Sequence, residues 1–368
     1  MAREHTITDL PPGGMPGQAG LVGAVTDNAM ARAVALAERG VGHGPNPRVG
    51  CVITDHLGVV LGEGWHRGAG TVHAEVAALA DAREHGRDVG GAVAFVTLEP
   101  CSHTGRTGPC TQALIEAGIT AVRYAVEDPN PTAAGGGKVL RDAGVDAVFV
   151  PHEGAAELNV RWLVAMRIGR PYVIAKWAAT LDGRTAAVDG TSFWITGEES
   201  RAHAHVVRGQ VDAIVVGTGT VAIDDPSLSA RAGSESAGSE SARGDETGHQ
   251  PLRVVMGLRD TGGKRVWRDG NAIAARTHDP AAVLADLHRR QVRVVLVEGG
   301  STVTTAFLAA GLVDEIHAYI APAILGAGTS AVGDLGITAM SGALRGTDAS
   351  SLRLGADTLV IAHVAEGN

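Results

Sequence analysis

Apolar residues follow short helical and extended patterns along most of the 368-residue chain. Met30, Ala33, Val34 and Ala37 recur at the spacing of one helix face and predict a helix over 27–39. Short apolar runs bounded by Gly, Pro, Asn or Asp predict buried strands with helical patterns between them. The predicted strands cover 49–53, 59–62, 92–98, 122–126, 145–150, 172–178, 213–216, 253–256, 272–275, 292–297, 315–320 and 358–364. Strands that alternate with helices in this way are typical of α/β folds.

The length of the chain fits two α/β domains of about 150–200 residues each. A connecting amphipathic helix is predicted over 151–170, between a first domain over 27–150 and a second over 171–368. Residues 1–26, rich in Gly and Pro, are expected to form a flexible tail. The stretch 231–250 contains Gly-Ser-Glu-Ser-Ala twice and almost no apolar residues, so we expect a disordered insertion within the second domain.

Composition and charge narrow the class of protein. The net charge of −9 and the 3% of aromatic residues argue against a nucleic-acid binder and favour a small-molecule substrate. Three cysteines do not make a disulfide framework, which favours a reducing compartment. Without a run of 18 apolar residues or a signal peptide, we expect no membrane segment and a cytoplasmic location.

The segment from His73 to Cys110 carries the clearest chemistry. His73-Ala74-Glu75 is followed by Pro100-Cys101 and Pro109-Cys110. One imidazole, two thiols and a carboxylate that is not a ligand are the parts of a catalytic zinc site. Zinc deaminases carry H-x-E followed by P-C-x-x-C, and here eight residues separate the cysteines. We predict that His73, Cys101 and Cys110 bind zinc and that Glu75 transfers protons.

Each of these residues taken alone also has a structural interpretation. A buried histidine and buried free cysteines are common in α/β cores, and Cys51, inside a predicted strand, is interpreted as core. Asn46, between Pro45 and Pro47, either contacts a substrate or marks a turn, and the segment alone does not decide. The glycine-punctuated loop that contains His103 and Arg106 either holds a small anion or only links the two thiols.

The second half of the chain contains a buried lysine and two glycine-rich turns. Lys176 lies within an apolar strand, where a lysine is unusual unless it points into a site. Gly217-Thr218-Gly219-Thr220 and Glu298-Gly299-Gly300-Ser301-Thr302 each follow a predicted strand and expose backbone N–H groups that suit a phosphate. A tight turn without a ligand is the alternative for both. The second turn runs into a helix predicted over 304–310.

From Asp27 to Val364 the chain resembles the bifunctional riboflavin-biosynthesis deaminase/reductase family. The motifs that carry the resemblance are Pro45-Asn46-Pro47, Val49-Gly50-Cys51, His73-Ala74-Glu75, Glu99-Pro100-Cys101-Ser102-His103, Gly105-Arg106-Thr107, Asp128-Pro129-Asn130-Pro131, Lys176, Leu181-Asp182-Gly183-Arg184, Trp194-Ile195, Asp224-Asp225-Pro226 and Val297-Glu298-Gly299-Gly300. So many motifs in one order are specific. The resemblance implies an α/β protein with a cytidine-deaminase-like three-layer αβα domain followed by a dihydrofolate-reductase-like αβα domain.

For the first domain, the resemblance implies zinc-dependent hydrolytic deamination of 2,5-diamino-6-(5-phosphoribosylamino)pyrimidin-4(3H)-one. The zinc would be held by His73, Cys101 and Cys110, and Glu75 would be the general acid and base. Asn46 and His103 would touch the substrate. The expected partner is therefore a pyrimidine ribotide rather than nucleic acid or membrane, and we expect a homo-oligomer.

For the second domain, the resemblance implies NADPH-dependent reduction of the ribosyl group to give 5-amino-6-(5-phosphoribitylamino)uracil. Lys176, Asp224 and Glu298 would line the reaction centre, and the motif does not say which of them moves a proton. The residues expected to hold substrate are Ser192, Arg208, Leu228, Arg231 and Glu298. Those expected to hold NADPH are Ala178, Trp194, Thr220, Asp224, Leu258, Gly300, Ser301, Thr302, Val303, Thr304, Thr305 and Ala306.

The chain departs from the family pattern in a few places. Gly108 stands where the family usually has Pro, and Gly257 stands where many relatives carry an acid. Arg259 nearby offers a positive charge to a 2′-phosphate. Two other classes share single features. A nucleoside or tRNA-base deaminase has the zinc motif but calls for basic and aromatic surface, and a ligand-binding protein with a structural zinc requires a fourth ligand.

Overall fold

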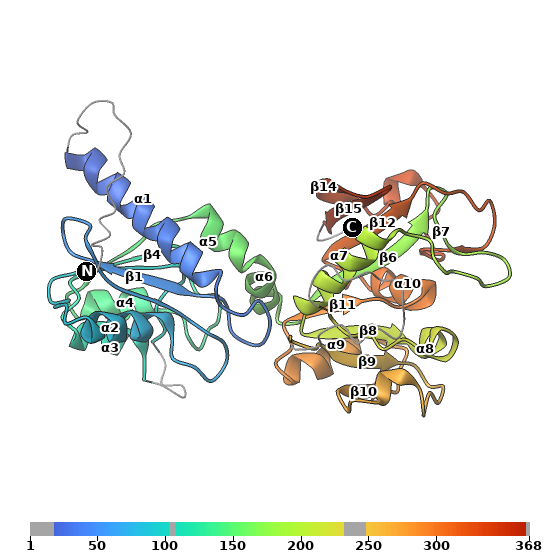
Figure 1. The fold of residues 1–368 in the computed structure, drawn as a ribbon, viewed down its shortest axis with the longest axis horizontal. Coiled ribbons are helices and arrows are strands. Elements are labelled where there is room, and N and C mark those ends of the chain that lie inside the picture. The colour runs from blue at the N-terminus through green and yellow to red at the C-terminus, as the bar shows by residue number, and fades with distance from the viewer. Residues whose placement is uncertain (1–17, 103–107, 232–247, 366–368) are drawn as a thin grey trace. The chain divides into compact units, whose positions relative to one another are not determined.

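The computed structural model describes residues 18–102, 108–231 and 248–365 (Figure 1). The chain divides into two compact units, Met1–Ile168 and Gly169–Asn368. Each unit has its own main sheet and its own apolar core, so each is described separately. No helix in the described ranges is both long and apolar enough to cross a bilayer. Most of the predicted insertion at 231–250 lies outside the described residues.

The first unit is built on a five-stranded sheet in the order β2-β1-β3-β4-β5. Strand β1 pairs antiparallel with both β2 and β3, whereas β3, β4 and β5 are parallel. Parallel strands are usually connected by helices, which explains why helical patterns separate the later strands in the sequence. The bounds are β1 (Gly50–Thr54), β2 (Val60–Trp65), β3 (Val93–Val96), β4 (Ala121–Tyr124) and β5 (Asp146–Phe149).

Helices cover both faces of this sheet, giving the three-layer αβα arrangement that the resemblance implies. Met30, Phe95 and Leu163 belong to the core on one face, and Ala78, Leu114 and Leu140 to the core on the other. The first face carries α1 (Gln18–Ala37), α5 (Glu153–Leu158) and α6 (Val160–Ile168); the second carries α2 (Ala74–Glu84), α3 (Cys110–Glu116) and α4 (Gly136–Asp142) (Figure 1).

Two glycines of β2 allow α2 to lie directly on the strand. A Cβ atom on Gly62 would come within 2.3 Å of the carbonyl oxygen of Ala78, and one on Gly64 within 2.4 Å of the carbonyl oxygen of Ala74. Helix α2 therefore packs so close to the strand that no residue larger than glycine fits at either position. This packing fixes the start of α2, directly after His73.

Two elements of the first unit differ from the prediction. Helix α1 begins at Gln18, so the stretch expected to be a tail up to residue 26 is partly helical. The single connecting helix over 151–170 is two helices, separated at Asn159. The side chain of Asn159 accepts a hydrogen bond from the Arg48 N–H at 2.9 Å and donates one to the Arg48 carbonyl at 2.7 Å. These bonds compete with continuous helix.

The second unit has an eight-stranded sheet in the order β10-β9-β8-β11-β6-β12-β15-β14. The six strands from β10 to β12 are parallel, and β15 and β14 continue the sheet antiparallel. The bounds are β6 (Tyr172–Thr180), β8 (Ala213–Gly217), β9 (Leu252–Met256), β10 (Ala272–Ala275), β11 (Val294–Val297), β12 (Glu315–Ala321), β14 (Gly346–Leu354) and β15 (Asp357–Val364). A two-stranded ribbon joins β7 (Arg184–Ala186) to β13 (Thr329–Ser330).

Helices also lie on both faces of the second sheet (Figure 1). Helices α9 (Pro280–Arg289) and α10 (Ser301–Ala309) contribute Leu287 and Phe307 to the larger core. Helix α7 (Glu198–Gly209) packs on the opposite face, where Ala204 meets Tyr319. The short helix α8 (Thr218–Asp224) follows β8 directly. At this point the sequence predicted a glycine-rich turn, whereas the structure has a helix.

Candidate functional site

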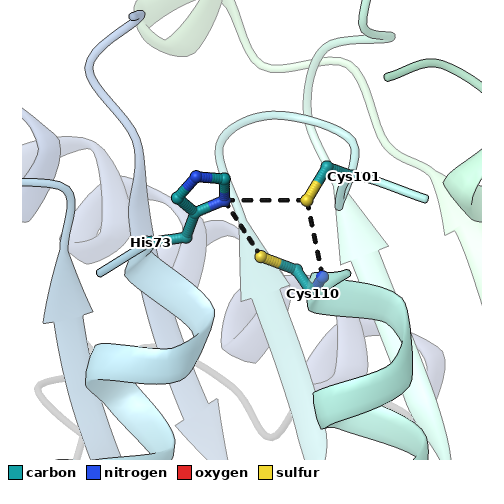
Figure 2. A group of neighbouring side chains, drawn as sticks. All are labelled: His73, Cys101 and Cys110. Atoms are coloured by element: carbon teal, nitrogen blue, oxygen red, sulfur yellow. Dashed lines mark hydrogen bonds between the residues drawn. The ribbon is translucent and has the colours of Figure 1, made fainter. Parts of the chain in front are cut away.

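In the first unit, His73, Cys101 and Cys110 come together as predicted (Figure 2). The Nδ1 atom of His73 lies 3.2 Å from Sγ of Cys110 and 3.6 Å from Sγ of Cys101. The backbone N–H of Cys110 donates to Sγ of Cys101 at 3.4 Å. Both thiols are buried and the imidazole is half-buried. All three potential ligand atoms lie within 4.8 Å of one another.

Three separate elements supply these side chains. His73 precedes the first residue of α2, Cys101 follows the loop after β3, and Cys110 is the first residue of α3. Hydrogen bonding from Cys110 lowers the pKa of the Cys101 thiol to about 4, although burial opposes this. The same hydrogen bond raises the pKa of Cys110. Of the two thiols, Cys101 therefore loses its proton the more easily.

The geometry of the cluster fits a zinc ion. Ligand atoms at tetrahedral zinc, with bonds of about 2.0–2.3 Å, lie roughly 3.3–3.8 Å apart. The two distances from His73 Nδ1 are close to this range. Imidazole and thiolate are also the ligand types that zinc prefers. Within the described part of the chain the cluster has three members, the number found in catalytic rather than structural zinc sites.

Glu75 lies in the first turn of α2 and is 3% exposed. Burial raises the pKa of its carboxyl group, and the nearby charge of Cys101 raises it further. A carboxyl group with a raised pKa close to a cluster of potential metal ligands, but not part of it, is suited to a general acid and base. The proton-transfer role of Glu75 stays a prediction.

The amide of Asn46 is oriented by a residue that the sequence analysis did not identify. Nδ2 of Asn46 lies 3.0 Å from Nε2 of His66, and Nδ1 of His66 lies 3.0 Å from the carbonyl oxygen of Val72. Burial lowers the pKa of His66, so its ring is neutral. A neutral ring donates from Nδ1 to the carbonyl and accepts from Asn46 at Nε2. His103, also predicted to touch substrate, lies outside the described residues.

The loop that carries Cys101 is held by its neighbour Glu99. The Glu99 carboxylate accepts hydrogen bonds from the N–H of Gly137 at 2.8 Å and from the N–H of Asp128 at 3.3 Å. The start of α4 packs so closely that a Cβ atom on Gly136 would lie 1.7 Å from the carbonyl oxygen of Pro100. The Gly-Gly-Gly motif at the start of α4 therefore holds the Glu-Pro-Cys motif in place, through the hydrogen bond from Gly137 to Glu99 and the packing of Gly136 against Pro100.

In the second unit, Lys176, Arg208 and Glu298 form a buried charged cluster. The guanidinium of Arg208 donates two hydrogen bonds to the Glu298 carboxylate, at 2.6 and 2.8 Å. Nζ of Lys176 lies 3.8 Å from the same carboxylate. Lys176 comes from β6, Arg208 from α7, and Glu298 directly follows β11. The prediction that Lys176 points into a site is consistent with this cluster.

Electrostatics within the cluster favour its charged forms. Burial alone would raise the pKa of Glu298, but the charges of Arg208 and Lys176 outweigh burial and lower that pKa to about 2. Burial lowers the pKa of Lys176, and Glu298 opposes the effect. Glu298 is therefore ionised at neutral pH. Asp224 lies at the end of α8, on a separate element, and burial raises its pKa.

The two glycine-rich turns lie side by side because β8 and β11 are parallel neighbours. The N–H of Gly300 donates to Oγ1 of Thr220 at 3.2 Å. A Cβ atom on Gly299 would lie 2.5 Å from Cβ of Val303, so only glycine allows α10 to begin here. Helix α10 begins at Ser301, earlier than predicted, which puts Ser301 and Thr302 in its first turn. Backbone N–H groups at such a helix start suit a pyrophosphate.

The remaining predicted residues occupy varied settings. Trp194 is 61% exposed with the guanidinium of Arg201 above its ring, whereas Leu228 is buried with a positive φ of 55°. Leu258 is exposed beyond the end of β9. The other residues predicted to bind substrate or cofactor lie within the described ranges, and their contacts do not point to a particular ligand. They are Ala178, Ser192, Arg231, Thr304, Thr305 and Ala306.

Gly257 has a structural reason to be glycine. Its φ is +129°, and a Cβ atom there would lie 2.6 Å from Oγ1 of Thr218. A side chain at this position would be strained and would displace Thr218. An acidic side chain therefore does not fit this backbone.

Two family models match the two units. The cytidine and deoxycytidylate deaminase zinc-binding region matches residues 25–126, and the RibD C-terminal domain matches residues 171–360. Riboflavin biosynthesis protein RibD of Corynebacterium ammoniagenes is 49% identical over 292 residues, which are 78% of this chain and 82% of that protein. The chain belongs to the RibD family. RibD of Escherichia coli is 40% identical over 326 residues, covering 81% of this chain and 88% of that protein.

Solved RibD structures match both units of the chain. RibD of Acinetobacter baumannii superposes with a TM-score of 0.82 at 35% identity, covering 93% of this chain and 99% of that one. A Thermotoga maritima protein named as a diaminohydroxyphosphoribosylaminopyrimidine deaminase/5-amino-6-(5-phosphoribosylamino)uracil reductase gives 0.77 at 31% identity, with the same coverage. This RibD-family chain is thus a bifunctional deaminase and reductase.

Three residues of this RibD-family chain were missed at the level of sequence: His66, His203 and Tyr319. A local signal existed for His66 and for Tyr319. His66 directly follows β2, and His317 and Tyr319 alternate along β12 with apolar residues between them. Polar side chains at alternating positions of a buried strand face one side of a sheet, where a site can form. His203 has no such local signal, because its partner comes from β12.

Proposed function

We propose that the chain converts 2,5-diamino-6-(5-phosphoribosylamino)pyrimidin-4(3H)-one into 5-amino-6-(5-phosphoribitylamino)uracil in two steps. The first step replaces the ring amino group with oxygen from water and releases ammonia. The second adds hydride to C1′ of the ribosyl group. The observation that carries the proposal is the three-ligand His/Cys/Cys cluster beside buried Glu75, on one chain with a RibD C-terminal domain.

In the deaminase step, His73, Cys101 and Cys110 would hold a zinc ion that makes water a nucleophile at neutral pH. Glu75 would take a proton from that water and transfer it to the ring and then to the departing ammonia. Its raised pKa suits a group that must both accept and release a proton. Asn46 would bind the substrate, with His66 fixing the direction of its amide.

In the reductase step, NADPH would supply the hydride. The C1′–O4′ bond opens, C1′ receives the hydride, and one proton from solvent balances the reaction. Lys176, Asp224 and Glu298 would line the reaction centre, and Arg208, held by Glu298, would contribute to substrate binding. The protein's main contribution is then orientation of the ring, the sugar chain and the nicotinamide.

The turn from Gly300 to Ala306 would hold the pyrophosphate of the cofactor, next to Thr220. The preference for NADPH is supported by Arg259 in the segment after β9, which offers a positive charge to a 2′-phosphate.

Incubation with the diaminopyrimidine ribotide tests both steps. Ammonia release is expected with or without NADPH, and loss of absorbance at the nicotinamide band only when NADPH is present. Lys176→Ala is expected to abolish NADPH oxidation while leaving ammonia release intact. Parallel loss of both activities in a folded variant would contradict two separate sites. No ammonia from the metal-loaded protein would overturn the proposed substrate.

A further inference from the structure

The aromatic ring of Tyr319 lies beside the ammonium group of Lys176. Strands β6 and β12 are parallel, with His317 opposite Lys176 and Tyr319 opposite Ala178. Alternate residues of paired strands face the same side of a sheet, so Lys176, His317 and Tyr319 share one face. Nζ of Lys176 is 5.3 Å from the centroid of the Tyr319 ring. An ammonium within about 6 Å of a ring face is attracted by the ring's electrons.

Helix α7 holds this ring in place. Tyr319 is 1% exposed, and its hydroxyl lies 2.8 Å from Nδ1 of His203. Burial and the proximity of His317 lower the pKa of His203, so the imidazole is neutral and is hydrogen-bonded to the tyrosine hydroxyl. The same helix supplies Arg208, which holds Glu298. Two side chains of α7 therefore hold, by hydrogen bonds, the two groups that lie near Nζ of Lys176.

The charge state of Lys176 depends on what surrounds it. Glu298, after β11, favours the ammonium form, whereas Arg208 of α7 and burial disfavour it. On β12, His317 lies opposite Lys176, and His203 of α7 contacts the hydroxyl of Tyr319. The hydroxyl of Tyr319 keeps its proton because burial and Glu298 raise its pKa. The ring is thus a neutral contact that favours the ammonium.

We propose that Tyr319 is a positioning residue of the reductase centre, whose ring face holds the Lys176 ammonium in place while His203 fixes the ring. The inference rests on the proposed function, because it requires Lys176 to act in the reductase reaction. It adds two residues, Tyr319 and His203, to those that the family motifs carry.

The test is a direct titration of Lys176. The chain contains only three lysines, Lys138, Lys176 and Lys264, so NMR of selectively labelled lysine side chains gives three signals, and Lys176→Arg identifies one of them. In Tyr319→Leu the Lys176 pKa is expected to fall by roughly half a unit to one unit relative to the native chain. Tyr319→Phe keeps the aromatic face and is expected to change the pKa much less.

Reductase kinetics give a second readout. The alkaline limb of the kcat profile should move to lower pH in Tyr319→Leu, with a several-fold lower kcat and an unchanged Kd for NADPH. Ammonia release reports that the first unit is folded, and the unchanged Kd for NADPH reports the same for the second unit. Should the leucine variant not fold, phenylalanine rings with increasing fluorination at position 319 weaken the attraction at nearly constant size. The Lys176 pKa should then fall stepwise with fluorination.

Three results would overturn the inference. They are an unchanged Lys176 pKa in Tyr319→Leu, an equal shift in the leucine and phenylalanine variants, and no trend with fluorination. His203→Gln provides a further check, since it should shift the Lys176 pKa in the same direction but less. Failure of the proposed function looks different, because the native protein would then not oxidise NADPH with the ribotide, whereas the lysine titration would still respond to the ring.

Discussion

Arg208 and Glu298 meet through two hydrogen bonds in the interior of the second unit, although 90 positions separate them in the sequence. In the intact pair, each charged group has a partner of opposite charge, and the Glu298 carboxylate also lies near the ammonium of Lys176. Removal of either residue would leave the other charge in the interior without its main partner, which destabilises the fold. The arrangement therefore makes the stability of the second unit depend on residues of its candidate reductase site.

Replacement of Arg208 by Met should destabilise the second unit strongly. Glu298 would keep only Lys176 at 3.8 Å, and removing one partner of a buried pair costs about 3–5 kcal/mol. Hydrogen exchange of β6 and β11 amides measures the change in the free energy of unfolding. Arg290→Ala is the matched control in the same unit, because it removes an exposed pair with Asp286 that is worth about 0.3–0.5 kcal/mol. Equal small effects would contradict the role given to the buried pair.

The second unit should lose stability as the pH falls from 6.5 towards about 4. Burial, followed by the charges of Arg208 and Arg231, lowers the pKa of His205 to about 4. The unfolded chain takes up the proton near pH 6.5, while the folded chain resists it, so acid favours unfolding across this window. Unfolding midpoints of the second unit between pH 7 and pH 4 measure the effect. His205→Gln should flatten the curve above pH 4, and an unchanged curve would rule His205 out.

Glu75→Gln should separate metal binding from deamination. His73, Cys101 and Cys110 remain, so one zinc per chain is expected in the purified variant. Loss of a general acid and base costs about 10²- to 10⁴-fold in rate. Metal analysis and ammonia release measure the two properties. Glu84→Gln, on the exposed end of the same helix, is the control and should be unaffected. Normal deamination by Glu75→Gln would show that another group moves the proton.

Gly136→Ala should weaken metal binding without touching a ligand. The new Cβ atom would meet the carbonyl oxygen of Pro100, so the segment that carries Cys101 must move. Competition with a chelator measures the zinc affinity, which is expected to fall at least tenfold, as for other residues that support metal ligands. Gly42→Ala is the control, because nothing lies within 4 Å of its added Cβ atom. Equal affinities would show that the loop tolerates the shift.

Features that depend on neighbouring residues in the sequence were predicted better than features that depend on distant ones. The sequence predicted that His73, Cys101 and Cys110 come together, and they do, because residue type and spacing carry this signal locally. The roles given to Glu75 and Lys176 stay predictions. Helix ends were less well predicted. Helix α1 begins at Gln18, and Asn159 interrupts the expected connecting helix. In the second case the cause is the hydrogen bonding of Asn159 to Arg48, which no local pattern contains.

The sequence by itself determined the α/β class, the apolar strands and the set of candidate metal-binding side chains, since burial and ligand chemistry depend on residue type. Only the tertiary structure decided which distant residues act together. Asn46 is hydrogen-bonded to His66, and Thr220 to Gly300. Tyr319 contacts both Lys176 and His203. The physical reason is strand order: β8, β11, β6 and β12 are neighbours in the sheet but not in the sequence, and their pairing is fixed only when the whole core packs.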